Sequence, residues 1–163
     1  MKSGTILSIV VIILVFGGLL LAGNMAKTGK VEKEQALTSR EVALACTTDM
    51  ATEYHIHPAL MVIVNGEEVL VPENIGITPN CMTSIHTHHE KNVLHVEAPV
   101  QKDFTLGDFF AVWGKDFSSS KLLDNVITDK SEIVVTVNGV RVETYENTVL
   151  GDKDKIVIEY RQK

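Results

Sequence analysis

Residues 3–26 contain no charged side chain, and residues 5–23 are dominated by aliphatic residues. As an α-helix that rises about 1.5 Å per residue, this stretch is long enough to cross the ~30 Å hydrocarbon core of a membrane. We therefore expect residues 1–26 to form a single transmembrane anchor. A cleaved signal peptide is the alternative, but its apolar region is usually about 7–15 residues long, and residues 24–26 match a small-x-small cleavage site poorly.

The charges that flank the apolar stretch do not decide its orientation, because Lys2 on one side faces Lys27, Lys30 and Lys33 on the other. Only a few residues precede the stretch, which favours a signal anchor with the rest of the chain outside the cytoplasm. We therefore expect a single-pass protein of the cell membrane. Its expected partners are the membrane itself, through residues 5–23, and a membrane protein complex.

Charge excludes nucleic acid as a partner. Lys2 is the only charged residue before Lys27, so 14 of the 15 basic residues and all 21 acidic residues lie from Lys27 onward, which gives that part a net charge of −7. Binding to phosphate backbones requires clustered Lys and Arg. The many β-branched residues after position 59 also argue against intrinsic disorder.

Between the anchor and the domain, residues 27–50 are expected to form a juxtamembrane stalk, with a short helix over about residues 31–46, where helix formers are frequent and Gly and Pro are absent. Apolar residues recur there at about helical spacing, at Leu37, Leu44 and Ala45. This stripe either rests on the domain or belongs to a solvated stalk. Residues 51–163 are expected to form the globular domain.

Beyond Pro58 the sequence favours β-strands. Two pairs of apolar runs are each joined by Asn-Gly, whose residues accept the positive φ of a type I′ hairpin turn. The expected hairpins are residues 60–64 with 67–71 around Asn65-Gly66, and residues 133–137 with 140–144 around Asn138-Gly139. A last strand is expected over residues 155–160.

Residues 105–113 predict one short helix, with Thr105 as its N-cap and Gly114 at its end. Its apolar face is expected to pack on a sheet and comprises Leu106, Phe109, Phe110 and Trp113. Strands before and after one helix predict an α+β domain with a small, mostly antiparallel or mixed sheet. Residues 133–158 resemble the end of a ubiquitin-like β-grasp domain, and this resemblance implies a β-grasp-like arrangement.

The histidines are concentrated in one part of the chain. All six lie within 41 consecutive residues, at His55, His57, His86, His88, His89 and His95. Residues 84–97 alternate polar and apolar side chains on both sides of a polar loop, 89–92, and therefore predict a third hairpin.

With Glu90-Lys91 at the centre of that hairpin, His86 faces His95 across the two strands and Ser84 faces Glu97. Opposed residues share a face of the sheet, as do residues two apart along one strand. One face therefore carries His86, His88, His95 and Glu97. The other carries Ile85, Thr87, Leu94 and Val96.

Neutral imidazoles that converge from adjacent strands are suitable ligands for Zn(II) or Cu(II). We predict His86, His88 and His95 as metal ligands, His57 as a fourth, and Glu97 as a carboxylate that orients a ligand. His57 would contribute only if its strand neighbours the hairpin. The alternatives are a hydrogen-bonded structural cluster and a metal-free role in proton transfer or pH sensing.

Cys46 and Cys81 leave three interpretations open. They form a disulfide between the stalk and the domain, or Cys81 ligates a metal, or both remain free thiols. Ligation by Cys81, with Met82 and Met50 nearby, would favour Cu(I). The sequence contains no Gly-x-Ser-x-Gly, P-loop or Gly-x-Gly-x-x-Gly motif.

A set of motifs over residues 55–114 resembles a group of uncharacterised, membrane-anchored prokaryotic proteins. The motifs are His55-Ile-His57, Val64-Asn-Gly66, Pro72-Glu-Asn-Ile-Gly-Ile77, Cys81, Ile85-His-Thr-His88, His95-Val-Glu-Ala-Pro99 and Phe104-Thr-Leu-Gly-Asp-Phe-Phe-Ala-Val-Trp-Gly114. Members of the group usually have Asp after His-Thr-His and Gly before the His-x-Glu strand, where this chain has His89 and Asn92. Asn also tolerates a positive φ, so the turn is expected to be kept. The resemblance implies an ordered site without implying its chemistry.

The function expected from the sequence is a membrane-anchored, extracytoplasmic copper- or zinc-binding protein that is not an enzyme. The first alternative is a zinc-dependent hydrolase or hydratase, in which three His ligands leave a position for an acidified water and Glu97 or Glu90 acts as base. The second is a metal-free structural subunit of a membrane complex.

Overall fold

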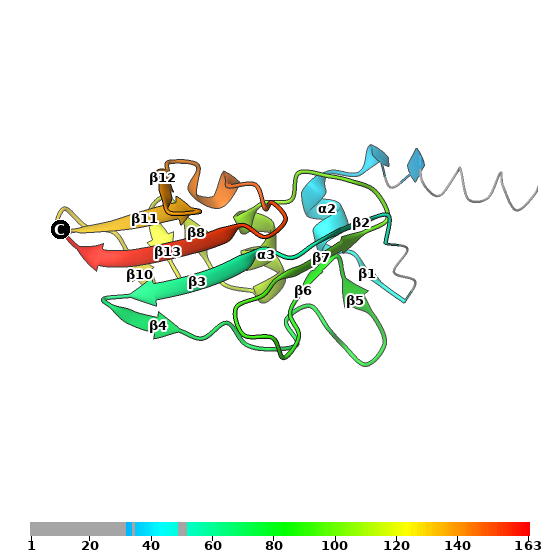
Figure 1. Ribbon diagram of the computed structural model, residues 1–163, viewed down its shortest axis with the longest axis horizontal. Helices are drawn as coiled ribbons and strands as arrows, with labels where there is room; N and C mark the ends of the chain where they lie inside the picture. The colour runs from blue at the N-terminus through cyan, green and yellow to red at the C-terminus, as the bar shows by residue number, and fades with distance from the viewer. Residues whose placement is uncertain (1–31, 34, 49–51) are drawn as a thin grey trace, which may run out of the picture. The chain divides into compact units, whose positions relative to one another are not determined.

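The computed structural model describes residues 32, 33, 35–48 and 52–163 (Figure 1). The expected anchor over residues 1–26 lies outside the described residues. Within the described part, no helix combines the length and apolar character needed to cross a bilayer. Leu37–Lys163 is one compact unit. This unit is a mixed α+β domain made mostly of sheets with few helices, as expected.

The largest sheet has five strands in the order β12-β11-β13-β3-β4. The strands are β3 (Ala59–Val64), β4 (Glu67–Val69), β11 (Ser131–Val137), β12 (Val140–Val142) and β13 (Lys155–Gln162). β13 runs parallel to β3, and the other neighbours are antiparallel. Both predicted Asn-Gly hairpins are confirmed, with positive φ at Asn65, Gly66, Asn138 and Gly139.

The predicted short helix is confirmed as α3 (Leu106–Trp113). The Thr105 side chain accepts a hydrogen bond from the Asp108 backbone N–H, and Asp108 accepts one from the Thr105 backbone, so each satisfies an otherwise unpaired donor at the helix start. Gly114 ends the helix in the left-handed conformation. Leu106, Phe109 and Phe110 are buried in the core, and Trp113 packs against it half-buried.

The expected single helix over residues 31–46 is interrupted, because Thr38 caps a separate helix, α2 (Ser39–Leu44). Val42 and Ala43 form its buried side, whereas Leu44, which was expected to lie on the apolar stripe, is 48% exposed. Arg40 binds the Asp108 carboxylate at 2.8 Å and donates to the Gly107 carbonyl at 2.8 Å. α2 is therefore an integral part of the domain.

The remaining strands form three small antiparallel sheets, β1-β5, β10-β9-β8 and β2-β7-β6. The strands are β1 (Cys46–Thr47), β2 (Tyr54–Ile56), β5 (Met82–Thr83), β6 (Ile85–His86), β7 (His95–Ala98), β8 (Phe117–Ser118), β9 (Lys121–Leu122) and β10 (Asn125–Val126). A short 3-10 helix, η1, covers Tyr145–Asn147. The sheet β2-β7-β6, which we call the histidine sheet, carries the candidate site (Figure 1).

The loop over residues 72–77 packs against the histidine sheet. Thr87 Oγ1 donates to the Pro72 carbonyl at 2.8 Å and accepts from the Ile75 N–H at 3.0 Å. Gly76 has a φ of +74°, and a Cβ there would overlap the side chain of Thr83. The close approach of this loop to β5 and β6 therefore requires glycine at position 76.

Candidate metal centre

The histidine sheet places its imidazoles and its apolar side chains on opposite faces. β6 pairs with β7 so that His86 lies opposite His95, which confirms the predicted register. Ile85, Leu94 and Val96 are fully buried in the core. The turn lies one residue later than expected, since the Val93 N–H bonds to the Glu90 carbonyl at 3.3 Å and the positive φ falls on Asn92.

β2 lies on the other side of β7, with His55 opposite Glu97 and Ile56 opposite Val96. This arrangement meets the condition under which the His55-Ile-His57 segment was expected to contribute. β7 is thus the central strand, and its His95 lies between histidines from both neighbouring segments.

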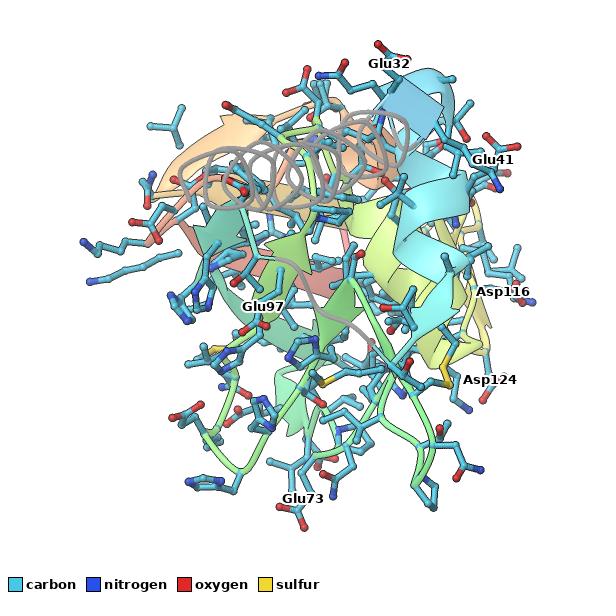
Figure 2. The ribbon with its side chains drawn as sticks, turned by 90° about the vertical axis from the view of Figure 1, so that its right-hand side faces the viewer. Glu32, Glu41, Glu73, Glu97, Asp116 and Asp124 are labelled. Carbon is cyan, nitrogen blue, oxygen red and sulfur yellow. A yellow bond between two sulfur atoms is a disulfide. The ribbon has the colours of Figure 1, made fainter. Side chains whose placement is uncertain are left out.

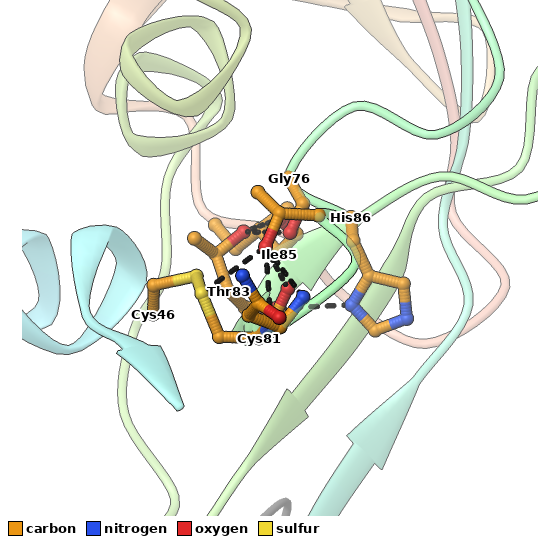
Figure 3. The surroundings of a disulfide bond; sticks show 8 residues. Cys46, Gly76, Cys81, Thr83, Ile85 and His86 are labelled. Atoms are coloured by element: carbon orange, nitrogen blue, oxygen red, sulfur yellow. Dashed lines mark hydrogen bonds between the residues drawn. A yellow bond between two sulfur atoms is a disulfide. The ribbon is translucent and has the colours of Figure 1, made fainter. Parts of the chain in front are cut away.

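His86 is completely buried, with 0% of its surface exposed. Its Nδ1 lies 3.0 Å from the Thr83 carbonyl oxygen (Figure 3). A carbonyl oxygen only accepts, so Nδ1 carries a proton, and in the neutral ring, which burial favours, Nε2 carries the lone pair. Nε2 is buried and has no hydrogen-bond partner among the residues that the structure describes. Leaving such an acceptor unpaired costs about 1–3 kcal/mol.

His95 is held by a carboxylate in a similar way. Its Nε2 lies 2.8 Å from Glu90 Oε2, so Nε2 acts as the donor and the lone pair is on Nδ1. Nδ1 in turn lies 4.0 Å from Glu97 Oε1. A histidine that donates one ring N–H to a carboxylate and presents the other nitrogen is the usual arrangement of a metal ligand.

His86, His88 and His95 form an inner triad, as predicted. One nitrogen from each lies within 4.8 Å of the others. The ring centroids are 4.9 Å apart for His86 and His88 and 4.6 Å apart for His88 and His95. Around a tetrahedral zinc with bonds of about 2.05 Å, ligand nitrogens lie about 3.4 Å apart, so small side-chain rotations would close the triad on an ion.

His57, predicted as a fourth ligand of the same ion, instead belongs to an outer triad with His55 and His95, whose ligand nitrogens also lie within 4.8 Å of one another. The His57 ring centroid is 4.4 Å from that of His55 and 4.7 Å from that of His95. The sequence reasoning did not choose His55 as a ligand, although its His-x-His spacing to His57 was the available signal.

Glu97 lies between the outer histidines. Its side chain is labelled in Figure 2. Its Oε1 is 3.1 Å from His55 Nε2 and 4.0 Å from His95 Nδ1. Glu97 was predicted to orient a ligand of the inner set, and that role stays a prediction, because its close contact is with His55 of the outer triad. The Asp152 carboxylate accepts from the His57 backbone N–H at 3.1 Å. No signal in the sequence points to Asp152, whose contact with His57 joins segments 95 residues apart, or to Thr83, whose backbone carbonyl contacts His86 three residues further on.

Burial keeps part of the cluster neutral. It lowers the pKa of His86 below its ordinary value, and the hydrogen bond to Thr83 opposes this only in part. The pKa of His57 is also lowered, first by burial and then by the charges of His55 and His95. The hydrogen bond from His95 lowers the pKa of Glu90. Neutral imidazole is the form that binds a metal.

The structure joins Cys46 and Cys81 in a disulfide, with their Cα atoms 5.4 Å apart (Figure 3). The bond links the segment after α2 to the segment that leads into β5 and Thr83. Because both sulfur atoms are used, neither cysteine offers a thiolate to a metal. The described candidate ligand groups are made of histidine alone, and His89 belongs to neither.

Comparison of the chain with known proteins finds no matching family model, no matching curated protein and no matching solved structure. The candidate site therefore has to be interpreted from its own geometry.

Proposed function

We propose that the domain binds one Zn(II) or Cu(II) ion at the inner triad of His86, His88 and His95, and that it holds or delivers this ion without catalysing a reaction. The observation that carries the proposal is His86 Nε2. It is a buried lone pair without a hydrogen-bond partner in the described part of the chain, and its ring belongs to a group of three imidazoles.

A purely structural histidine cluster explains this atom poorly. A buried histidine in a structural role normally satisfies both ring nitrogens, since an unpaired one costs stability. Among the described residues, Nδ1 alone has a partner, and its bond to the Thr83 carbonyl favours the tautomer that leaves Nε2 available. A bound cation at Nε2 would supply the missing partner.

The donor set favours divalent ions of intermediate softness. Three imidazoles suit Zn(II) and Cu(II), whereas Cu(I) prefers thiolate and thioether sulfur. The disulfide between Cys46 and Cys81 removes the Cys81 thiol, on which the Cu(I) alternative depended.

The proposal is tested with the full-length chain, produced without a histidine tag and freed of metal with a chelator. Isothermal titration with Zn(II) and with Cu(II) is expected to show one tight site. The variant His86→Ala, His88→Ala is expected to weaken the tight site at least about 100-fold, equivalent to about 2.7 kcal/mol.

The matched control is His89→Ala, which removes the neighbouring histidine that lies outside both triads. It should leave the affinity unchanged. Equal affinity in the parent chain and in the variant without His86 and His88 would overturn the inner site, as would the absence of any site tighter than about 1 μM.

The proposal extends to the cellular setting, with residues 5–23 as the membrane anchor and the domain outside the cytoplasm. The disulfide supports this orientation, because structural disulfides persist mainly in oxidising compartments. Protease added to intact cells should degrade the domain, and protection of the domain would contradict the orientation.

We also assign the five-stranded sheet and α3 to a β-grasp-like arrangement. Two hairpins flank the helix in the sequence, and the last strand, β13, lies parallel to the first, β3, at the centre of the sheet. The histidine sheet would then be an addition formed by β2, which precedes the first hairpin, and by β6 and β7, which lie between that hairpin and the helix.

A further inference from the structure

The outer triad of His55, His57 and His95 differs from the inner one in its access to solvent. The His55 side chain is 45% exposed and His57 is half-buried, whereas His86 is completely buried. His95, which both triads use, has a side chain that is 13% exposed. An ion arriving from solvent can therefore reach His55 directly, whereas His86 has no exposed surface.

The five histidines form an unbroken series between these two extremes. The ring centroids are 4.4 Å apart for His55 and His57 and 4.7 Å apart for His57 and His95. They are 4.6 Å apart for His95 and His88 and 4.9 Å apart for His88 and His86. The short spacing between neighbouring rings would let an ion exchange one imidazole for the next along this series.

His95 is the exchange point because it belongs to both candidate ligand sets. Its Nδ1 carries the available lone pair, since Nε2 donates to Glu90. One lone pair binds one ion, so the two triads cannot each hold a separate ion through that nitrogen. They compete for a single ion, and the triad whose ligands are better fixed holds it at equilibrium.

Fixed ligands favour the inner triad. The bond between His86 and the Thr83 carbonyl presets its tautomer, and Nε2 has no described partner to give up. In the outer triad, His55 Nε2 is engaged with Glu97 at 3.1 Å, so either that contact must break or His55 must bind through its other nitrogen. Glu97 also supplies a negative charge beside the exposed end, which attracts a cation.

We propose that His55, His57 and His95 form a second, weaker site for the same divalent ion, at which the ion enters from solvent before it passes through His95 to the inner triad. This entry site rests on the metal binding proposed above. In this scheme the exposed histidines determine how fast the ion is loaded, and the buried histidines determine how tightly it is bound.

Equilibrium binding tests the second site directly. The full-length variant His86→Ala, His88→Ala retains the outer triad and is expected to bind one Co(II) ion at least about tenfold more weakly than the parent chain, with a visible absorption band from histidine ligation. Adding His55→Ala and His57→Ala should abolish that residual band. If the two variants bind Co(II) equally, the outer site does not exist, while the inner site can still stand.

Loading kinetics test the order of events. When Co(II) is mixed with the metal-free chain in a stopped-flow instrument, His55→Ala, His57→Ala should slow the appearance of the inner-site spectrum at least about tenfold and change the final affinity by less than about threefold. The control His89→Ala should load at the parent rate. An unchanged loading rate in the outer-triad variant would overturn the entry role.

The two proposals fail in different ways. If the outer-triad variant loses the tight site while His86→Ala, His88→Ala keeps it, the inner site is refuted and the outer triad is the principal site. The entry site alone is refuted by a different pair of results. In that case His86→Ala, His88→Ala loses the tight site, and His55→Ala, His57→Ala changes neither the rate of Co(II) loading nor the weak binding that remains without His86 and His88. Circular dichroism of each variant shows whether a loss of binding reflects unfolding.

Discussion

The five-stranded sheet and the histidine sheet belong to the same domain but are stabilised differently. In the five-stranded sheet, β11 has seven residues and β13 eight, and they pair along the whole length of β11. In the histidine sheet, β6 has two residues and β7 four. The larger sheet rests on continuous backbone pairing and apolar burial, and the smaller one has few backbone pairs of its own.

The histidine sheet is held instead by side chains and by a covalent bond. Thr87 fastens the loop over residues 72–77, Thr83 Oγ1 donates to the Ile85 carbonyl at 2.7 Å, and the disulfide anchors β5. A buried histidine replaces an apolar side chain at the centre of this region. The difference indicates that the larger sheet supplies the stability of the fold and that the smaller one gives up stability to present ligands.

The largest expected effect comes from removing the disulfide. Cys46→Ser with Cys81→Ser opens a link between residues 35 positions apart, and restoring that chain entropy to the unfolded state should lower the free energy of unfolding by roughly 4 kcal/mol. The affinity for Zn(II) should fall about tenfold, because β5 then holds the Thr83 carbonyl against His86 less firmly. Urea unfolding and calorimetric titration measure the two changes. An unaltered metal affinity would show that the histidine sheet does not depend on its covalent link.

Truncation in the larger sheet should separate stability from metal binding. Ile158 is fully buried and lies between Val62 and Val135 on the neighbouring strands. Ile158→Ala is expected to lower the free energy of unfolding by about 3 kcal/mol. The folded variant should bind Zn(II) as the parent chain does. A tenfold loss of affinity in this variant would mean that the two sheets are coupled more tightly than their separate pairing indicates.

Replacing His86 by an apolar residue tests whether the buried histidine is kept for stability or for binding. His86→Leu removes the unpaired Nε2 and adds apolar burial, but it loses the bond to the Thr83 carbonyl. These opposing changes should leave the metal-free protein within about 1 kcal/mol of the parent chain. Zn(II) should raise the Tm of the parent chain and have no such effect on the variant. A metal-free variant that is more than about 2 kcal/mol less stable would assign His86 a structural role.

The two hairpins and the last strand of the five-stranded sheet could be predicted from the sequence because their signals are local, whereas the parallel pairing of β13 with β3 joins distant segments. Asn65-Gly66 and Asn138-Gly139 specify turns within a few residues, and alternation along the flanking strands specifies their faces. The break at Thr38 was not predicted, because the residues on both sides of the Thr38–Glu41 capping box are rich in helix formers and favour one continuous helix. α2 begins after Thr38, and this start places Val42 rather than Leu44 on the buried face of the helix.

The site could be predicted only in part. The register that places His86 opposite His95 follows from alternation about one turn, and the inner triad follows from that register. The outer triad required knowing that β2 pairs with β7, a contact between segments about 40 residues apart that no local pattern encodes. The role of Thr83 likewise depends on backbone geometry next to His86 and is invisible in the residue types.

Acid should affect the two sheets in different pH ranges, and two variants separate the ranges. The pKa of Glu132 in the larger sheet is lowered from its ordinary value of 4.5 by its hydrogen bond to Arg161 and by Arg141. Its stabilising effect is therefore present above about pH 4.5 and is lost as the pH falls below that value. Glu132→Gln should flatten the acid end of a plot of unfolding free energy against pH and leave the region near pH 6 unchanged.

The histidine sheet should respond at higher pH. Burial lowers the pKa of His86 from its ordinary value of 6.5, so the unfolded chain binds a proton near pH 6.5 that the folded chain resists. The stability of the metal-free protein should therefore decrease as the pH falls from 7 through 6.5, and His86→Leu should reduce this slope. Unfolding by urea in the presence of a chelator, at several pH values between 4 and 8, measures both ranges. If the plots of unfolding free energy against pH are parallel for the parent chain and His86→Leu above pH 5, His86 binds a proton equally well in the folded and unfolded states. Burial would then not lower its pKa.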